Sequence, residues 1–384
     1  MNAPADSPLL ASRWDEKQAA KLTAPEQLLY RSNLLGADLR ITNFGGGNTS
    51  AKLTAADPLT GKDVPVLWVK GSGGDLGSMK LDGFSTLYLD KLESLKSLYR
   101  GPDHEDEMVG YLPHCTFNLN PRAASIDTPL HGFLPYAHVD HMHPDAVIAI
   151  AASKNSEALT REIYGDTIGW LPWRRPGFEL GLMLEKFARA NPKAVGVVLG
   201  SHGLFTWGPD GRTCYETTIA TINKAIAWLA TRTAAVRAFG GSAVTAAEPA
   251  ARRAVAARLM PAIRGLIGGA ERKVGHFDDS AAVLEFVNSK RLRELAALGT
   301  SCPDHFLRTK IRPLVIDHAG DIDATIAGLE AAVAAYRVDY AAYYERCKHP
   351  GSPAMRDPNA VVYLVPGVGM ITFARDKATA RIAG

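Results

Sequence analysis

The sequence predicts an α/β protein with two compact units. Short apolar runs beside glycine-rich turns alternate with amphipathic stretches of helical period, a pattern typical of sheets covered by helices. At 384 residues the chain exceeds the usual size of one domain. Residues 240–248 contain Gly, Ser, Thr and Ala, as a linker does. We therefore expect a first domain at 13–240 and a C-terminal α/β extension at 250–384.

Composition excludes several classes of function. Hydrophobic residues make up 46% and charged residues 22%, the balance of a soluble globular protein. The formal charge is +3 without a long Lys/Arg run, so we expect neither nucleic acid nor a membrane surface as a partner. No basic leader or membrane-length apolar run is present, and we expect a cytoplasmic protein. The four widely spaced cysteines favour reduced, buried thiols.

Two glycine-rich turns follow the first helix, which is predicted at 26–35. Residues 39–41 have strand-like alternation and run into G-G-G-N-T-S at 45–50, where backbone N–H groups can approach an anion. A second apolar run leads into G-S-G-G-D-L at 71–76. Neither turn matches a nucleotide-binding loop, so the pair favours a small phosphorylated ligand. Ordinary tight turns are the alternative.

A helix is predicted within 81–98, and the acidic stretch 103–107 is interpreted as solvated.

The segment 125–143 has an unusual density of metal-binding side chains. They are Asp127, His131, His138, Asp140, His141 and His143. On an extended strand His141 and His143 point to the same face and can bind one cation. We interpret His138 and Asp140 as groups that orient the ligands, and His131 as a packed, hydrogen-bonded histidine. Asp127 is a candidate ligand or general base.

The third nitrogen of the site is predicted to come from His202. The apolar strand A-V-G-V-V-L-G ends directly before Ser201-His202-Gly203, so this imidazole lies at a strand exit. A long amphipathic helix follows at 214–230 and should pack on the sheet. Three imidazoles on one cation are typical of a catalytic zinc site with an open position.

The C-terminal extension is predicted to contain helices at 250–267, 281–298 and 323–346. Its closing segment, V-V-Y-L-V-P-G-V-G-M-I-T-F-A-R-D-K-A-T-A, has the pattern of V-G-V-V-L-G-S-H-G-L-F-T-W-G-P-D-G-R-T-C without the histidine. One hypothesis is that the extension is a degenerate half-repeat that supports the first domain.

Together these motifs resemble the class II aldolase/adducin family. They are G-G-N-T-S, G-S-G-G, S-x-D-x-x-x-H, H-x-H and S-H-G in that order, and they span about 26–230. The closest variant is the rhamnulose-1-phosphate aldolase unit that many bacteria fuse to a short-chain dehydrogenase, as H-V-D-H-M-H-P-D-A and T-S-C-P-D-H-F-L-R-T-K indicate. We expect the dehydrogenase half to be absent here.

The resemblance implies a fold, a cofactor and roles for individual residues. The fold is an α/β/α sandwich with a largely antiparallel central sheet, usually in a homotetramer with sites at subunit contacts. Zinc, or another divalent cation, would be bound by His141, His143 and His202. Asp127 would be the catalytic acid/base, with Tyr164 of a neighbouring subunit as proton donor. The phosphate-binding residues would be Asn48, Ser72, Gly73 and Ser125.

The resulting hypothesis is a zinc-dependent aldolase. It would cleave rhamnulose 1-phosphate to dihydroxyacetone phosphate and lactaldehyde through a metal-stabilised enediolate. Alternatives within the family are a sugar-phosphate 4-epimerase, a dehydratase, a decarboxylase or an aldolase for unphosphorylated substrates. A non-catalytic, adducin-like interaction module is the alternative of another class, and the three histidines argue against it.

Overall fold

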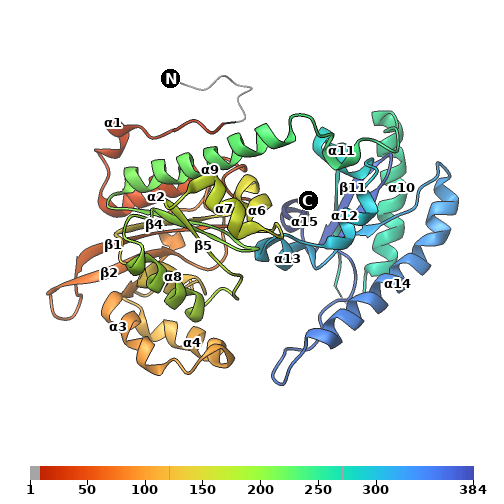
Figure 1. The fold of residues 1–384 in the computed structure, drawn as a ribbon. Helices are drawn as coiled ribbons and strands as arrows, with labels where there is room; N and C mark the ends of the chain where they lie inside the picture. Colours follow the sequence, from red (N-terminus) through yellow and green to blue (C-terminus); the bar gives the residue numbers. More distant parts are fainter. Residues whose placement is uncertain (1–8, 121, 270) are drawn as a thin grey trace. The chain divides into compact units, whose positions relative to one another are not determined.

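The chain folds into two units, each with its own sheet and hydrophobic core. The computed structural model describes residues 9–120, 122–269 and 271–384. The first unit ends at Arg232 and the second runs from Thr233 to Gly384 (Figure 1). This division lies close to the 240–249 segment between the two predicted domains. Among the described residues no helix combines the length and the apolar character that a membrane span requires.

Unit 1 is built on a seven-stranded sheet in the order β3-β2-β1-β4-β7-β6-β5. All neighbours are antiparallel except β5 and β6. The strands are β1 (Asn48–Ala56), β2 (Asp63–Lys70), β3 (Phe84–Tyr88), β4 (His138–Met142), β5 (Ile168–Leu171), β6 (Gly196–Leu199) and β7 (Gly203–Gly208). The helices are α1 (Glu16–Ala19), α2 (Ala24–Gly36), α3 (Leu89–Ser94), α4 (Glu105–Tyr111), α5 (Thr128–Phe133), α6 (Asp145–Ala151), α7 (Ser156–Tyr164), α8 (Phe178–Ala190) and α9 (Gly211–Thr233).

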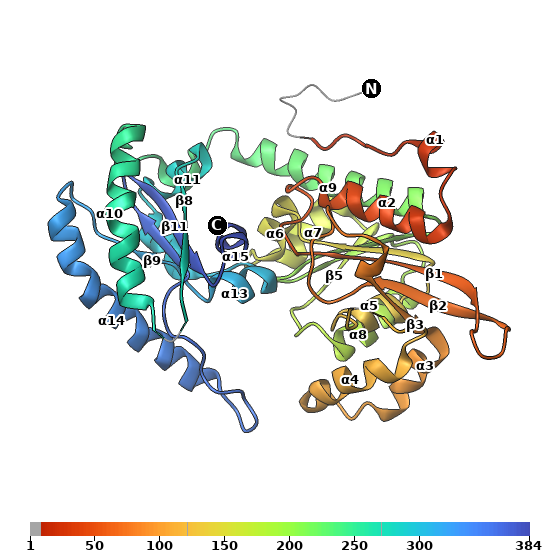
Figure 2. The ribbon, with the colours of Figure 1, turned by 180° about the vertical axis from the view of Figure 1, so that it is seen from behind.

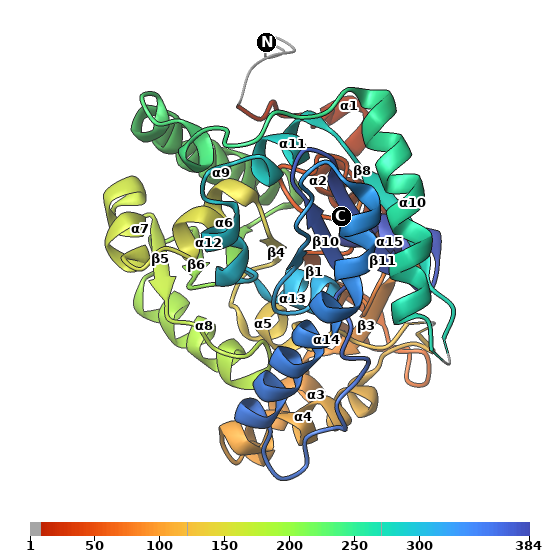
Figure 3. The same ribbon diagram turned by 90° about the vertical axis from the view of Figure 1, so that its right-hand side faces the viewer.

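Helices cover both faces of this sheet. Helices α2, α6, α7 and α9 pack on one face, in a core that includes Leu35, Tyr215 and Ile222. Helices α3, α4, α5 and α8 cover the other face. Figure 3 shows α7 and α8 on opposite sides of β5. The predicted α/β/α sandwich with a largely antiparallel central sheet is therefore confirmed.

Unit 2 has a four-stranded sheet in the order β8-β11-β10-β9, in which only β9 and β10 are parallel. Helices α10 and α14 pack together on one face, and α11 and α12 cover the other (Figure 2). The strands are β8 (Val274–Asp278), β9 (Leu314–Val315), β10 (Val362–Val365) and β11 (Gly369–Ala374). The helices are α10 (Pro249–Ile267), α11 (Ala281–Val287), α12 (Leu292–Leu298), α13 (Pro303–Thr309), α14 (Ile322–Cys347) and α15 (Lys377–Ala383). The expected C-terminal α/β extension is present.

Some local predictions are wrong. Residues 39–41 form a turn rather than a strand, and β1 begins only after the three glycines, at Asn48. The helix predicted within 81–98 is present as α3, but it is short, because F-S-T-L-Y before it forms β3 and pairs with β2. The predicted helix at 281–298 is split into α11 and α12. Glu105 is buried instead of solvated, since its carboxylate accepts the N–H groups of Phe178 and Glu179 at 2.8 and 2.7 Å. Cys347 is exposed, whereas the other three cysteines are buried free thiols.

Candidate metal centre and active site

Three histidines meet at one end of the unit 1 sheet. His141 lies in β4, His143 follows the end of that strand, and His202 lies in the turn between β6 and β7. Strands β4 and β7 are antiparallel, with Met142 opposite Leu204, so the end of one strand lies beside the beginning of the other. The sheet topology therefore joins residues that are 61 positions apart.

The three rings converge through their Nε2 atoms. Nε2 of His141 lies 2.9 Å from Nε2 of His143 and 3.2 Å from Nε2 of His202. All three residues are buried, and their ligand atoms lie within 4.8 Å of one another. Tetrahedral zinc with Zn–N bonds of about 2.0–2.1 Å places its nitrogens about 3.3 Å apart. These residues therefore fit a divalent metal ion, and three protein ligands leave a coordination position open.

The tautomer of His141 follows from its backbone contact. Its Nδ1 lies 3.1 Å from the carbonyl oxygen of Leu204, which can only accept a hydrogen bond, so Nδ1 carries the proton and Nε2 is available to a cation. Burial, reinforced by His143 and His202, holds the pKa of His141 well below its ordinary value. This imidazole is therefore neutral at pH 7, as a metal ligand must be.

The backbone around His202 is specialised. Ser201 has a φ of 53°, in the left-handed region, and its N–H donates to the carbonyl of Ala151 at 2.8 Å. A Cβ at Gly203 would lie 2.5 Å from Cδ2 of His143 and 2.7 Å from the carbonyl oxygen of Met142. Only glycine permits this close packing, which brings His202 and His143 together.

The first glycine turn lies directly beside this centre. Asn48 is paired with His141 across the β1–β4 ladder, and a Cβ at Gly47 would lie 2.8 Å from the carbonyl oxygen of His141. The Asn48 amide donates to Oγ of Ser125 at 3.2 Å and to Oδ2 of Asp127 at 3.3 Å. Three predicted site residues thus form one hydrogen-bonded group next to the histidines. Asp127 lies outside the three-histidine ligand cluster.

The second glycine turn joins the same segment of chain. The N–H of Ser72 donates to the carbonyl of Ala123 at 2.9 Å. The N–H of Gly45 lies 3.5 Å from Oδ1 of Asp75, which connects the two turns. Gly73 has a φ of 72°, and a Cβ there would contact nothing within 4 Å, so this part of the turn is open. The structure therefore brings Asn48, Ser72, Gly73 and Ser125 into one connected region.

An arginine that the sequence motifs did not reveal organises the other side of β4. Arg31 of α2 is fully buried, and its Nε forms an ion pair with Oδ1 of Asp140 at 3.0 Å. Its other nitrogens donate to Nδ1 of His138 at 2.8 Å and to the carbonyl oxygen of Ser50 at 2.7 Å. The interpretation of His138 and Asp140 as partners of the metal ligands is therefore wrong. Both side chains are bound by Arg31, and the group that orients His141 is the carbonyl oxygen of Leu204.

His131 and Tyr164 are both integrated into the core. Nδ1 of His131 lies 2.8 Å from Oγ of Ser50, and burial lowers the pKa of this imidazole to about 3. The expected hydrogen-bonded packing of His131 is thus observed. The Tyr164 hydroxyl donates to the carbonyl oxygen of Thr221 at 3.1 Å within the α7–α9 core, and burial raises its pKa well above the ordinary value. The Tyr164 hydroxyl thus has a partner inside unit 1, and its expected role as proton donor to a neighbouring subunit stays a prediction.

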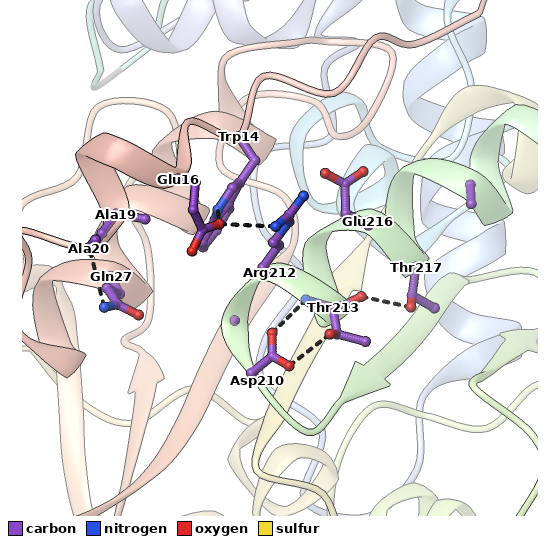
Figure 4. A pocket seen from close by; sticks show the side chains of 12 residues that line it. Trp14, Glu16, Ala19, Ala20, Gln27, Asp210, Arg212, Thr213, Glu216 and Thr217 are labelled. Carbon is purple, nitrogen blue, oxygen red and sulfur yellow. Dashed lines mark hydrogen bonds and ion pairs between the residues drawn. The ribbon is translucent and has the colours of Figure 1, made fainter.

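A separate pocket of about 820 Å³ lies between α1, α2 and the start of α9 (Figure 4). It is at the opposite end of β7 from His202, beyond Gly208. Two of its charged side chains form an ion pair, with Nη1 of Arg212 3.2 Å from Oε2 of Glu16. This pocket does not belong to the histidine centre.

Comparisons with known proteins agree with this architecture. Residues 26–229 match the class II aldolase and adducin N-terminal domain, and residues 254–384 match the second domain of class II aldolases. An N-terminal class II aldolase domain from Thermoplasma acidophilum is 32% identical, with a TM-score of 0.52, over 57% of this chain and 99% of that one. L-fuculose-1-phosphate aldolase from Thermus thermophilus is 14% identical, with a TM-score of 0.36, over 56% of this chain and 96% of that one, a likeness too distant to bear on function.

A longer relative matches both units. The "Uncharacterized oxidoreductase YuxG" of Bacillus subtilis (strain 168) is 39% identical over 375 residues, which are 97% of this chain and 54% of the relative. The chain therefore spans about half the length of this curated relative. From the domain match over more than half of its residues, the chain belongs to the class II aldolase and adducin family.

Proposed function

We propose that the protein is a zinc-dependent lyase that cleaves a ketose 1-phosphate of the rhamnulose 1-phosphate type. The products are dihydroxyacetone phosphate and lactaldehyde. The observation that carries the proposal is the convergence of three buried imidazoles beside the hydrogen-bonded group of Asn48, Ser125 and Asp127. An adducin-like interaction module has no use for such a ligand set.

The metal ion would be held by His141, His143 and His202. When bound, a divalent cation at this centre supplies Lewis-acid stabilisation of the negative charge that develops on the substrate. Neutral imidazoles preserve the full charge of the cation, and zinc is the ion that most often takes three such ligands in a catalytic site. His141 is held in place by β4, and the close packing of Gly203 limits the position of the His143 ring.

Asp127 is the proposed acid/base. In the cleavage the hydroxyl at C4 gives its proton to solvent water, the C3–C4 bond breaks as C4 becomes the carbonyl carbon of lactaldehyde, the electron pair of this bond passes toward the C2 carbonyl oxygen, and a proton is finally added at C3. The Asp127 carboxyl group transfers this last proton in the dihydroxyacetone phosphate half. The Asn48 amide holds Oδ2 at 3.3 Å and thereby fixes the direction of the carboxyl group.

The two glycine turns hold the phosphate group in this proposal. Asn48 and Ser125 lie at the first turn, and Ser72 and Gly73 form the second. Binding energy from the phosphate, which does not react, keeps the reacting carbons in position beside the histidines. The homotetramer and the cytoplasmic location expected from the sequence stay part of the proposal.

A substrate panel tests this function. Zinc-loaded protein is incubated with rhamnulose 1-phosphate and with unphosphorylated rhamnulose, and dihydroxyacetone phosphate, lactaldehyde and remaining sugars are quantified. We expect lactaldehyde and dihydroxyacetone phosphate in equal amounts from the phosphorylated sugar only. A C4 epimer or loss of water would assign the centre to an epimerase or a dehydratase. No conversion of the phosphorylated sugar by metal-loaded protein would contradict the proposal.

A further inference from the structure

An arginine side chain lies across the second glycine turn. A Cβ added to Gly74 would lie 3.7 Å from both Cζ and Nη1 of Arg122 and 3.8 Å from Nη2. A Cβ added to Gly71 would lie 2.8 Å from the Cβ of the same arginine. The glycines therefore provide the space in which the Arg122 guanidinium rests on the turn.

The segment that carries Arg122 is attached to both turns. Oγ of Ser85 donates to the carbonyl oxygen of Arg122 at 2.9 Å, and the N–H of Ser72 donates to the next carbonyl, that of Ala123, also at 2.9 Å. Three residues after Arg122, Ser125 accepts the Asn48 amide. These backbone and side-chain contacts fix the start of the arginine side chain relative to the glycine turns.

The guanidinium has no acidic partner within the described part of the chain. Asp75, the acid next to Gly74, is engaged elsewhere, because its carboxylate accepts from the Gly45 N–H at 3.5 Å and from Oγ of Ser78 at 3.0 Å. Glycine turns alone offer N–H dipoles without net charge, whereas a phosphomonoester carries nearly two negative charges. A planar guanidinium matches two phosphate oxygens at once.

We propose that Arg122 is the charged residue of the anion subsite and selects substrates that carry a phosphomonoester. This assignment rests on the proposed function and makes it more specific. Arg122 binds the phosphate group and takes no part in bond cleavage. Its loss therefore weakens binding of the phosphorylated substrate and leaves the metal centre intact.

The test compares Arg122→Gln and Arg122→Lys with Arg174→Gln, an exposed arginine of the same unit that serves as the control. Inorganic phosphate is the probe, and its dissociation constant is measured by calorimetry on the zinc-loaded protein. We expect Arg122→Gln to weaken phosphate binding about tenfold or more, Arg122→Lys to weaken it less, and the control to match the wild type.

Steady-state kinetics separate this proposal from the proposed function. With rhamnulose 1-phosphate we expect a higher KM for Arg122→Gln and a nearly unchanged kcat. Unchanged phosphate affinity and KM would overturn the role of Arg122 while leaving the aldolase intact. If Arg122→Gln loses phosphate binding but the wild-type protein cleaves no ketose 1-phosphate, the role of Arg122 in the subsite stands and the aldolase proposal is refuted. No phosphate binding by the wild-type protein would overturn the subsite.

A second, independent observation concerns the two sheets. Nine elements follow one another in the same order in both units, with α13 as the only α-helix inserted in the second series among the described residues. In unit 1 the series is α5-β4-α6-α7-β5-α8-β6-β7-α9, and in unit 2 it is α10-β8-α11-α12-β9-α14-β10-β11-α15. The strand orders β4-β7-β6-β5 and β8-β11-β10-β9 correspond, including the single parallel pair in each.

Side-chain contacts repeat as well. Asp210 before α9 accepts from the N–H of Thr213 at 2.8 Å, and Asp376 before α15 accepts from the N–H of Thr379 at 2.7 Å. A Cβ at Gly203 would lie 2.7 Å from the carbonyl oxygen of Met142, and one at Gly369 would lie 2.6 Å from the carbonyl oxygen of Asp278. The ladders pair Met142 with Leu204 and Asp278 with Met370, so the register is the same.

This register identifies the counterparts of the metal ligands. Phe277 corresponds to His141, Asp279 to His143 and Val368 to His202. Phe277 and Val368 belong to the apolar core of unit 2. Asp279 accepts from Nε of Arg252 at 2.9 Å and pairs with its Nη2 at the same distance. At the position in unit 2 that corresponds to His143, Asp279 therefore binds the guanidinium of Arg252 from α10 instead of a metal ion.

We infer that unit 2 is a copy of the metal-binding half of unit 1 in which the metal site is replaced by an apolar core and an internal ion pair. Each chain then binds one catalytic metal ion, in unit 1. The structural framework for a second site persists in unit 2, and suitable side chains should restore it.

The test rebuilds the lost site. On a His141→Ala/His202→Ala background, which should bind no zinc, Phe277→His/Asp279→His/Val368→His is introduced and zinc is counted by elemental analysis. We expect about one zinc per folded chain, with Phe277→His alone on this background as the control. A milder variant, Phe277→His/Val368→His, keeps Asp279 as a carboxylate ligand if the triple substitution prevents folding. Lack of zinc in both rebuilt proteins, or a second equivalent of zinc in the wild type, would overturn the inference.

Discussion

Asn48 lies directly opposite His141 in the ladder between β1 and β4, and its amide donates to Asp127 at 3.3 Å. One residue therefore connects the metal-binding strand, the first glycine turn and the candidate acid/base. The antiparallel register determines this relationship, since a shift of one residue would turn Asn48 to the other face of the sheet. Geometry at the centre thus depends on the pairing of two strands.

Asp127→Asn tests the acid/base assignment. An amide cannot exchange the proton in the dihydroxyacetone phosphate half, so we expect kcat for cleavage to fall about 10²- to 10⁴-fold. Zinc content should stay at one per chain, because Asp127 is outside the ligand cluster. Asp127→Glu restores a carboxylate and should retain more activity than the amide variant. Equal activity of wild type and Asp127→Asn would refute the assignment.

Gly203→Ala tests how the ligands are packed together. The new Cβ would lie 2.5 Å from Cδ2 of His143, and this atom belongs to a ring that must keep its position to bind metal. We expect zinc affinity, measured by competition with a chelator, to fall at least about tenfold. Gly110→Ala on α4 is the matched control, since its Cβ would contact nothing within 4 Å. Equal losses in both variants would show that the close packing at Gly203 is unimportant.

The buried Arg31–Asp140 ion pair should make the two residues interdependent in their contribution to stability, so that losing one partner costs more than replacing both. Removing one partner, in Arg31→Met or Asp140→Asn, leaves buried polar groups uncompensated and should reduce the free energy of unfolding by about 3–5 kcal/mol. Arg31→Met/Asp140→Leu should recover part of this loss, as urea denaturation would reveal. Arg100→Met breaks the exposed pair with Glu107 and is the control, with little change expected.

Stability should also fall in acid through the buried histidines. Burial lowers the pKa of His131 to about 3 and that of His138 to about 4, from an ordinary value of 6.5. Below pH 6.5 the unfolded chain takes up protons that the folded chain does not, so stability decreases until the folded pKa values are reached. In metal-free protein, His131→Gln should reduce the slope of unfolding free energy against pH by up to about 1.4 kcal/mol per pH unit. An unchanged slope would contradict burial of a neutral His131.

The sequence made the core of the site predictable because its information is local. His141 and His143 are two residues apart on a strand, so their spacing places them on one face, and the position of His202 before a glycine at the end of an apolar run marks it as a third candidate. The triplet G-G-G before Asn48 likewise marks an unusual turn. The position of the strand after this turn was not predictable, because Leu39 and Ile41 alternate as in a strand and yet belong to a turn.

The remaining features depend on contacts between distant segments. Arg31 has the appearance of an ordinary helix residue, and its role appears only when α2 packs on β4. The acceptor for His141 is a backbone carbonyl, which any residue could provide, so the pattern favoured the carboxylate of Asp140 instead. Tyr164 lies on an amphipathic helix, and its burial against α9 becomes evident only when the two helices pack together. Arg122 can be recognised as a candidate phosphate-binding residue only from the position of its guanidinium beside Gly74.

The most direct test of the account measures zinc content and cleavage together. Purified wild-type protein and His141→Ala/His202→Ala are analysed for bound metal and assayed with rhamnulose 1-phosphate, before and after treatment with a chelator. The account predicts about one zinc per wild-type chain, release of dihydroxyacetone phosphate that stops on chelation and returns with zinc, and neither zinc nor cleavage in the variant. Cleavage that persists in the metal-free protein or in the variant would contradict it.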